Sequence, residues 1–179
     1  RVEFMNSACG VCGQQSIERI VDRLPHSRNQ AATSHLAALP VCAIKLLIQQ
    51  LAAKQPLFSE TGGAHGVGLF DQSGQLLDVR EDIGRHNAFD KLLGANLPLL
   101  LEQNAQENNA LGVVLSSRAS FELVQKAAMA NMSYIIALGA PSSLAIDLAK
   151  ECDICLVGFA KSTPDTLACN VYSNQQRLV

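Results

Sequence analysis

The 179-residue chain has few aromatic and few charged residues. It contains no tryptophan, aromatic residues make up 4% of it, and charged residues make up 17%. The 14 lysines and arginines nearly balance the 16 aspartates and glutamates, so the net charge is −2. A chain that acts mainly by coating nucleic acid or an anionic membrane carries a large positive charge. We therefore expect no nucleic-acid or membrane partner, and any anion-binding site has to be local.

Long apolar runs are also missing. No stretch approaches the roughly 18 consecutive apolar residues that a membrane span requires, and the N-terminus lacks the basic, apolar and cleavage regions of a secretory signal. We therefore expect a soluble, cytoplasmic protein. The chain begins at Arg1 instead of methionine, which indicates that it is part of a longer protein. With 48% hydrophobic residues it has the composition of a globular domain.

Three motifs with known chemistry are absent. The phosphate-binding pattern GxxxxGK(S/T) does not occur, and Gly66 and Gly68 are followed by Asp71 where the dinucleotide pattern GxGxxG needs its third glycine. Zinc-dependent nucleobase deaminases carry H-x-E and P-C-x-x-C. No His-x-Glu occurs here, and Ala8 precedes Cys9 where those enzymes have proline. Walker-type ATP chemistry is therefore not indicated, and deamination is disfavoured.

Apolar residues recur at helical spacing in two early segments. Residues 14–24 carry apolar side chains at intervals of three and four until Pro25 ends the pattern, which predicts a short amphipathic helix. Its apolar face consists of Ile17, Ile20, Val21 and Leu24. A polar linker follows at 26–35, and Pro40 stands at the expected first position of a helix of about four turns.

The middle of the chain predicts a hairpin and a divided helix. Residues 64–71 and 75–81 flank a short Gln-Ser-Gly turn and read as two antiparallel strands. Asn87 is expected to cap the helix that follows. Gly94 and Pro98 are expected to divide that helical region into two.

From residue 111 onward, short apolar runs alternate with helical segments. Such runs are typical of buried parallel strands. Helices between such strands are typical of right-handed crossover connections. The expected strands are 111–115, 134–138, 154–159 and a closing strand at 168–173, with helices at 120–132 and 142–151. This alternation predicts an α/β domain.

The sharpest chemical feature is the Cys9-Gly10-Val11-Cys12 segment, with a further glycine after it. Two thiols separated by two residues can reach a common sulfur atom, so that one carries sulfur while the other exchanges with it or protects it. A thioredoxin-like redox pair is an alternative, although that design follows a strand, which is not evident here. Half of a zinc site is another alternative.

The chain has four further cysteines, and two of them bear on the zinc alternative. Cys152 and Cys155 repeat the CxxC spacing, and four thiolates could form a tetrahedral site. Their segment enters an apolar strand, however, where positions i and i+3 point to opposite faces. We therefore expect buried structural thiols there, and we expect Cys42 and Cys169 to pack in the core.

Polar residues crowd the junction between the second hairpin strand and the helix after it. They are Glu81, Asp82, Arg85, His86 and Asn87. One interpretation is an anion site, in which Arg85 and His86 contact the anion while the carboxylates orient them. The alternative is a solvated, salt-bridged turn. His65 is expected near the same region.

Three segments follow the expected parallel strands and should emerge at one edge of the sheet. They are 116–120, 139–143 and 160–164. Two of them open helices, whose free N–H groups favour phosphate, and Arg118 and Lys161 add positive charge. This arrangement predicts a phosphate-bearing ligand, with a nucleotide as the natural candidate. Ser120 and Ser142 are equally explained as ordinary helix caps.

Several ordered motifs together resemble the FdhD family, the accessory sulfurtransferases of formate dehydrogenase. The motifs are the CGVCG segment at 9–13, EDIGRHNAFDKLLG at 81–94, SSRAS at 116–120 and LVGF at 156–159. The resemblance covers nearly the whole chain and lacks the family's N-terminal region. It implies a cytidine-deaminase-like, three-layer α/β sandwich with a mixed, largely parallel sheet over residues 14–179. Residues 1–13 would form the CxxC loop and the end of an N-terminal segment.

The resemblance also implies a function. A family member accepts sulfur from a cysteine desulfurase as a persulfide, here on Cys9 with Cys12 as the auxiliary thiol. It passes the sulfur to the molybdenum bis(molybdopterin guanine dinucleotide) cofactor before that cofactor enters the formate dehydrogenase apoenzyme. A homodimer without a permanent metal is expected. The alternative is a non-catalytic chaperone that only binds the molybdenum cofactor.

The resemblance and the residue patterns together nominate a cofactor-binding set. The family places binding after the LVGF strand, where Pro164 stands in place of an expected arginine. The carried-over residues are Phe159, Ala160, Lys161, Ser162, Thr163 and Pro164. The residue patterns add Ser116, Arg118, Arg85 and His86.

Overall fold

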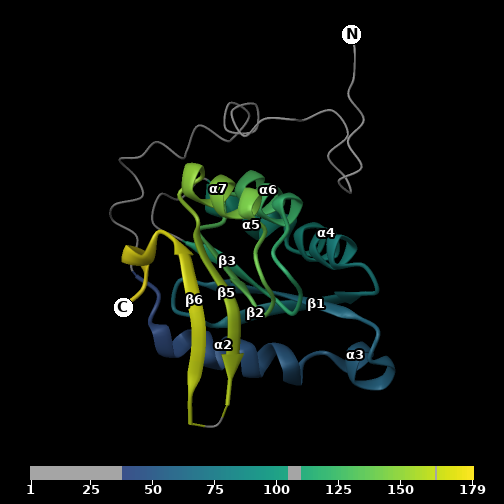
Figure 1. Ribbon diagram of the computed structural model, residues 1–179. Coiled ribbons are helices and arrows are strands. Elements are labelled where there is room, and N and C mark those ends of the chain that lie inside the picture. Colours follow the sequence, from purple (N-terminus) through teal and green to yellow (C-terminus); the bar gives the residue numbers. More distant parts are fainter. Residues whose placement is uncertain (1–37, 105–109, 164) are drawn as a thin grey trace, which may run out of the picture.

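A computed structural model describes residues 38–104, 110–163 and 165–179 (Figure 1). Predictions for the CxxC loop, the helix at 14–24 and the polar linker lie outside these residues. The elements in chain order are α2 (Val41–Ala53), α3 (Pro56–Thr61), β1 (His65–Asp71), β2 (Leu76–Asp82), α4 (Arg85–Ala95), α5 (Leu97–Asn104), β3 (Leu111–Leu115), α6 (Phe121–Met129), β4 (Tyr134–Ala137), α7 (Ser143–Glu151), β5 (Cys155–Ser162), β6 (Leu167–Ser173) and the short 3₁₀ helix η3 (Gln175–Arg177).

The strands form one six-stranded mixed sheet in the order β2-β1-β3-β4-β5-β6. The middle strands β3, β4 and β5 are parallel, whereas β1 and β2 on one side and β6 on the other pair antiparallel. Every residue of β3 and β4 is buried, as expected for strands covered on both faces. The sequence therefore predicted these strands from their apolar runs. Antiparallel pairings nevertheless outnumber the parallel ones.

Helices cover both faces of the sheet, so the fold has three layers (Figure 1). Helix α2 packs across one face and buries Ile44, Leu47 and Leu51 against it. Helices α4, α5, α6 and α7 lie on the other face, where Phe89 and Leu123 belong to a second core. The predicted three-layer α/β sandwich is confirmed, and its likeness to cytidine deaminases stays a prediction.

The start of α4 differs from the expectation that Asn87 caps it. Gly84 is the cap residue, and Asn87 lies inside the helix. The Asp82 carboxylate accepts hydrogen bonds from the Gly84 N–H at 3.0 Å and the Asn87 side-chain amide at 3.3 Å. The expected capping by Asn87 is therefore wrong, and the helix begins three residues earlier. The predicted division of the helical region is confirmed and falls at Asn96.

The hairpin turn between β1 and β2 depends on Gly74. Its φ of +81° lies in the left-handed region that other residues rarely adopt. An added Cβ would also collide with the Ala43 side chain on α2. The turn therefore packs directly against the helix layer.

The described cysteines fit the expectation in three of four cases. Cys152 and Cys155 are buried in the cores on opposite faces of the sheet, as expected, although Cys152 ends α7 and so owes its place to the helix layer instead of to strand alternation. Cys169 is half-buried and packs against the α2 side. Cys42 is exposed, so its predicted place in the core is wrong, because α2 turns the neighbouring Ala43 and Ile44 inward instead.

Neither a membrane span nor a metal cluster is found in the described part of the chain. None of its helices combines the length and the apolar character needed to cross a bilayer. No three histidine, cysteine, aspartate or glutamate side chains within it are grouped as metal ligands.

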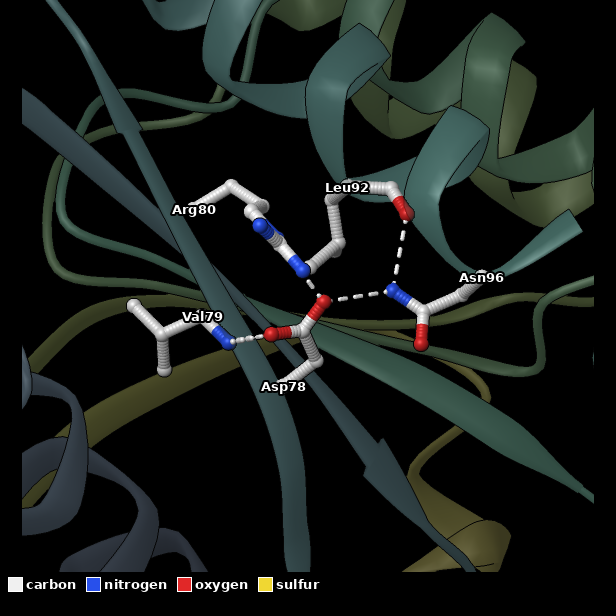
Figure 2. A network of polar contacts seen from close by, with 5 residues as sticks. All are labelled: Asp78, Val79, Arg80, Leu92 and Asn96. Carbon is white, nitrogen blue, oxygen red and sulfur yellow. Dashed lines mark hydrogen bonds and ion pairs between the residues drawn. The ribbon is translucent and has the colours of Figure 1, made fainter.

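A polar network ties the edge strand β2 to the end of α4 (Figure 2). One oxygen of Asp78 accepts hydrogen bonds from Arg80 at 3.0 Å and from Asn96 at 2.8 Å, and the other accepts from the Val79 N–H. Asn96 also donates to the carbonyl of Leu92 at 2.9 Å and so closes the helix end. Partial burial alone would raise the pKa of Asp78, but hydrogen bonds from Asn96 and Arg80 outweigh it and lower that pKa.

We predict that Asn96→Ala lowers the free energy of unfolding by about 1–2 kcal/mol at pH 7, because it removes one hydrogen bond to a carboxylate and one to a carbonyl. The depressed pKa means that Asp78 stabilises the fold above its ordinary pKa of 3.8 and loses that effect as the pH falls through its folded value. Denaturant unfolding should therefore show the difference between variant and parent narrowing as the pH falls below 3.8, towards the part that is due to the bond with the Leu92 carbonyl. Gln50→Ala, an exposed change on α2, is the control. An equal loss at all pH values would contradict the prediction.

Candidate functional site

The segments that follow β3 and β4 lie at one edge of the sheet, and hydrogen bonds join them to each other, to β1 and to Phe159 of β5. The Ser116 N–H donates to the Gly66 carbonyl at 3.0 Å, and the Ser116 hydroxyl accepts from the Gly66 N–H at 2.9 Å. The Gly139 N–H donates to Ser117 at 3.1 Å, and the Phe159 N–H donates to Gly139 at 3.1 Å. The predicted convergence is therefore confirmed for the segments after β3 and β4. At β5 it is Phe159 that joins them, and the predicted third segment, 160–164, does not.

The segments after β3 and β4 lie directly against each other. The Ala119 N–H donates to the Ala140 carbonyl at 3.2 Å, and the Ser142 N–H donates back to Ala119 at 3.1 Å. An added Cβ on Gly139 would meet the Arg118 backbone nitrogen at 2.9 Å. Glycine is thus required there for the close approach, which holds the exposed Arg118 at the edge.

Both of these segments open helices, and their two serines behave differently. Ser142 caps α7, and its hydroxyl accepts the Ala145 N–H at 3.2 Å. Ser120 occupies the cap position of α6, but its hydroxyl makes no capping bond. It lies instead 3.3 Å from the His86 Nε2 on α4. Ser142 therefore fits the ordinary capping explanation, while Ser120 connects the strand-end segment to the polar cluster.

His86 is the centre of a small polar group between α4 and α6. Its Nε2 lies 3.0 Å from Glu122 Oε2, with 29% of the histidine side chain and 14% of the glutamate side chain exposed. Desolvation lowers the pKa of His86 below its usual value of 6.5, and the nearby Arg85 acts in the same direction, whereas Glu122 opposes them. The neutral imidazole is therefore favoured at neutral pH.

Two buried polar atoms in this group have no hydrogen-bond partner within the described residues. They are Arg85 Nε and Glu122 Oε1. Buried polar atoms are normally satisfied, so each such atom is a candidate for contact with a ligand or with another part of the chain.

Helices α4 and α6 are connected by two polar pairs one turn apart. His86 pairs with Glu122, and Asp90 pairs with Lys126 at 2.5 Å, so each helix contributes residues i and i+4. The helices therefore run side by side with their N-termini together. Beyond the pairs lies an open groove of about 590 Å³. Its lining comprises His86, Leu93, Leu97, Leu100, Leu101, Glu122, Gln125, Lys126, Met129 and Ala130.

The expectation that Glu81 and Asp82 orient Arg85 and His86 is wrong. Both Glu81 oxygens accept backbone N–H groups at the start of α3, each at 2.9 Å. Asp82 pairs with Lys91 at 2.5 Å, and this contact, aided by the Gly84 N–H, lowers its pKa to about 2. These carboxylates are used to stabilise helix starts, so that part of the cluster is a salt-bridged turn.

The carboxylate that does contact His86, Glu122, was not identified from the sequence. It lies in the first turn of α6, where an acidic residue is ordinary because of the helix dipole. His65, which was expected nearby, stands opposite Asp82 in the β1–β2 register. The structure thus places His65 beside the salt-bridged turn that contains Asp82.

The segment after the LVGF strand is not a loop, contrary to expectation. Strand β5 continues to Ser162, with a register shift against β6 between Gly158 and Lys161. Phe159 takes a left-handed φ of +52° and is 43% exposed, while Ala160 is fully buried. The irregularity lets the strand continue and turns Phe159 outward, whereas Ala160 has no surface for a ligand.

The remaining residues of the nominated segment 159–164 lie in different surroundings. Lys161 is exposed. The Ser162 hydroxyl accepts from Gln49 on α2 at 3.4 Å, which relates it to the opposite helix layer. Thr163 begins the hairpin turn, where its hydroxyl lies 2.6 Å from that of Thr166. Pro164 lies outside the described residues, as do Cys9 and Cys12.

The structure therefore brings part of the predicted set together. Ser116 and Arg118 belong to the joined edge, Phe159 is bonded to it, and His86 reaches it through Ser120. We call this group, with Arg85 and Glu122, the strand-end site. The far end of β5 is a separate feature of the hairpin.

Known proteins similar to this chain include curated relatives named sulfur carrier protein FdhD. The one from Nocardia farcinica is 44% identical over 173 residues, which cover 96% of this chain and 57% of the relative. The one from Picrophilus torridus is 38% identical over 178 residues, which cover 98% of this chain and 62% of the relative. The chain thus spans about three fifths of the length of these relatives.

A solved structure is similar as well. A crystal structure from Desulfotalea psychrophila, named as a candidate formate dehydrogenase accessory protein, superimposes with a TM-score of 0.65 at 34% identity. The match covers 80% of this chain and 60% of that one. The family model described as FdhD/NarQ matches residues 1–179. The chain therefore belongs to the FdhD/NarQ family.

Proposed function

We propose that this chain is the part of a sulfur carrier that accepts sulfur from a cysteine desulfurase and passes it to the molybdenum bis(molybdopterin guanine dinucleotide) cofactor destined for formate dehydrogenase. The family membership and the names of the relatives support the sulfur-carrier role. The observation that carries the binding part is the hydrogen-bonded edge of strand ends that presents Arg118 beside two helix N-termini. We further propose that the protein acts as a homodimer.

In the proposed accepting step, the Cys9 thiolate attacks the outer sulfur of the donor's persulfide. A new S–S bond forms at Cys9, the donor's S–S bond breaks, and the donor cysteine leaves as a thiolate. Cys9 then holds the outer sulfur for the cofactor, and Cys12 can exchange with it. The glycines that flank these thiols favour access by a partner.

Residues of the strand-end site fit an anionic nucleotide. Arg118 can pair with phosphate oxygens, the N-termini of α6 and α7 add favourable dipoles, and the exposed Phe159 ring offers a stacking surface to a base. Lys161, exposed further along β5, adds a second cation for an extended ligand. Ala160 is excluded as a contact because it is fully buried.

The alternative is a cofactor-binding chaperone that carries no sulfur on its own thiols. Substitution of Cys9 distinguishes the two functions, because a chaperone keeps its activity without that thiol.

Mass spectrometry tests the sulfur-carrier function. We predict that the full-length protein, incubated with a cysteine desulfurase and cysteine, gains one sulfur atom on the peptide containing Cys9. Cys9→Ala should abolish both this gain and the support of formate dehydrogenase activity. The exposed Cys42 provides the matched control, and Cys42→Ala should change neither. Full activity of the Cys9 variant would favour the chaperone instead.

Titration calorimetry tests the nucleotide site. We predict that Arg118→Ala weakens binding of guanosine diphosphate at least about tenfold, which corresponds to about 1.4 kcal/mol, because it removes a charged donor to phosphate. Lys150→Ala, which removes an exposed cation at the far end of α7, should leave the affinity unchanged. Equal affinities for both variants and the parent would place the ligand elsewhere.

The protonation of His86 can be followed by NMR titration of its imidazole. Glu122→Gln should lower the pKa of His86 further, because the glutamate charge now raises it. Arg85→Gln should raise that pKa, because the guanidinium now lowers it. No shift in either variant would show that desolvation alone governs His86, and shifts of the same sign would contradict the opposite effects of the two charges.

A further inference from the structure

The groove beyond the two polar pairs exposes large apolar side chains on the α4–α7 face. Leu97 and Leu101 on α5 are 52% and 61% exposed, and Met129 on α6 is 46% exposed. All three line the groove together with the partly buried Leu93. Large apolar side chains gathered in one hollow usually mark a place where another segment binds.

The groove is apolar at one end and polar at the other. Met129 ends α6, and Leu97 and Leu101 belong to α5. Glu122, in the first turn of α6, pairs with His86 of α4. Glu122 belongs to this lining, and its Oε1 is buried without a hydrogen-bond partner among the described residues. An occupant that fits therefore presents a row of apolar side chains and a hydrogen-bond donor beside one end of that row.

Residues 14–24 of the same chain have this chemistry. Their apolar positions recur at intervals of three and four, which is the spacing of groove-binding helices. Gln14 and Gln15, at the start of the segment, supply amide donors. A four-position apolar row spans about 10 Å in helical geometry, comparable with the two turns of α5 and the end of α6 that carry the exposed leucines and methionine.

We propose that residues 14–24 bind in the groove formed by α4, α5 and α6, with their apolar side chains on Leu97, Leu101 and Met129. The connection is long enough, because residues 25–37 can extend about 45 Å, which exceeds the roughly 30 Å width of a small domain. The inference deepens the proposed function, and its meaning for sulfur transfer rests on that function. Cys12 lies only two residues before Gln14, so this binding keeps the CxxC segment within a few residues of the groove that contains His86 and Glu122.

Photo-cross-linking in the full-length protein tests the proposal. A benzoylphenylalanine at Leu101 should cross-link, within one chain, to the tryptic peptides derived from residues 14–24. The matched control is the same probe at Leu46, which is 52% exposed on α2 at the opposite face of the sheet. It should give no such product. Cross-links between two chains, or none to residues 14–24, would overturn the proposal.

Hydrogen exchange provides a second readout that needs no probe in the groove. In an Ile17→Asp, Ile20→Asp variant the amides of α5 should exchange on the order of tenfold faster, because its exposed leucines lose their cover. The amides of α2 should be unaffected. Unchanged exchange in α5 would overturn the proposal.

The sulfur-transfer test is read separately. The gain of sulfur on Cys9 is measured in the parent protein by the desulfurase assay. Its absence contradicts the proposed function alone, whereas a missing cross-link contradicts the groove proposal alone. The two failures are therefore distinguishable.

Discussion

Hydrogen bonds between backbone groups at the carboxyl ends of β3 and β4 and at Phe159 of β5 hold the strand-end site together. Gly139 donates a backbone hydrogen bond to Ser117, and Phe159 donates one to Gly139. Three segments that are far apart along the chain therefore share one edge of the sheet. These bonds need no particular side chain, but the close approach at Gly139 excludes any residue with a Cβ. Arg118 owes its position to this backbone arrangement. A rigid support of this kind reduces the entropic cost of binding a flexible ligand.

The paired helices α4 and α6 extend the edge into a second layer. His86–Glu122 and Asp90–Lys126 align the two helices, and His86 contacts Ser120 in the segment after β3. The hairpin side is organised independently, since Glu81 and Asp82 stabilise helix starts. The polar residues at 81–87 therefore have two roles. Glu81 and Asp82 stabilise the neighbouring turn and helices, whereas His86 lines the groove.

Much of this could be predicted from the sequence, because local patterns determine it. The apolar runs of β3 and β4 and the spacing on α2 are properties of short segments, and the convergence of strand ends follows from parallel pairing. The contact between His86 and Glu122 could not be predicted, since it joins residues 36 positions apart through the packing of two helices. The continuation of β5 was missed because the positive φ of Phe159 leaves no signature in a non-glycine residue. Burial of Ala160 follows from that same irregularity.

The pairing of the two ends of the described chain has a kinetic consequence. Leu39 pairs with Leu178, next to the amino ends of β4 and β5, and so at the side of the sheet opposite to the strand-end site. Residues 1–37 are therefore joined covalently to a fixed point of the domain, and the Cys9 thiol is confined to a volume around it. A thiol carried on the same chain as the strand-end site meets a ligand held there at an effective concentration that is set by the geometry of the chain and not by the amount of protein in the cell.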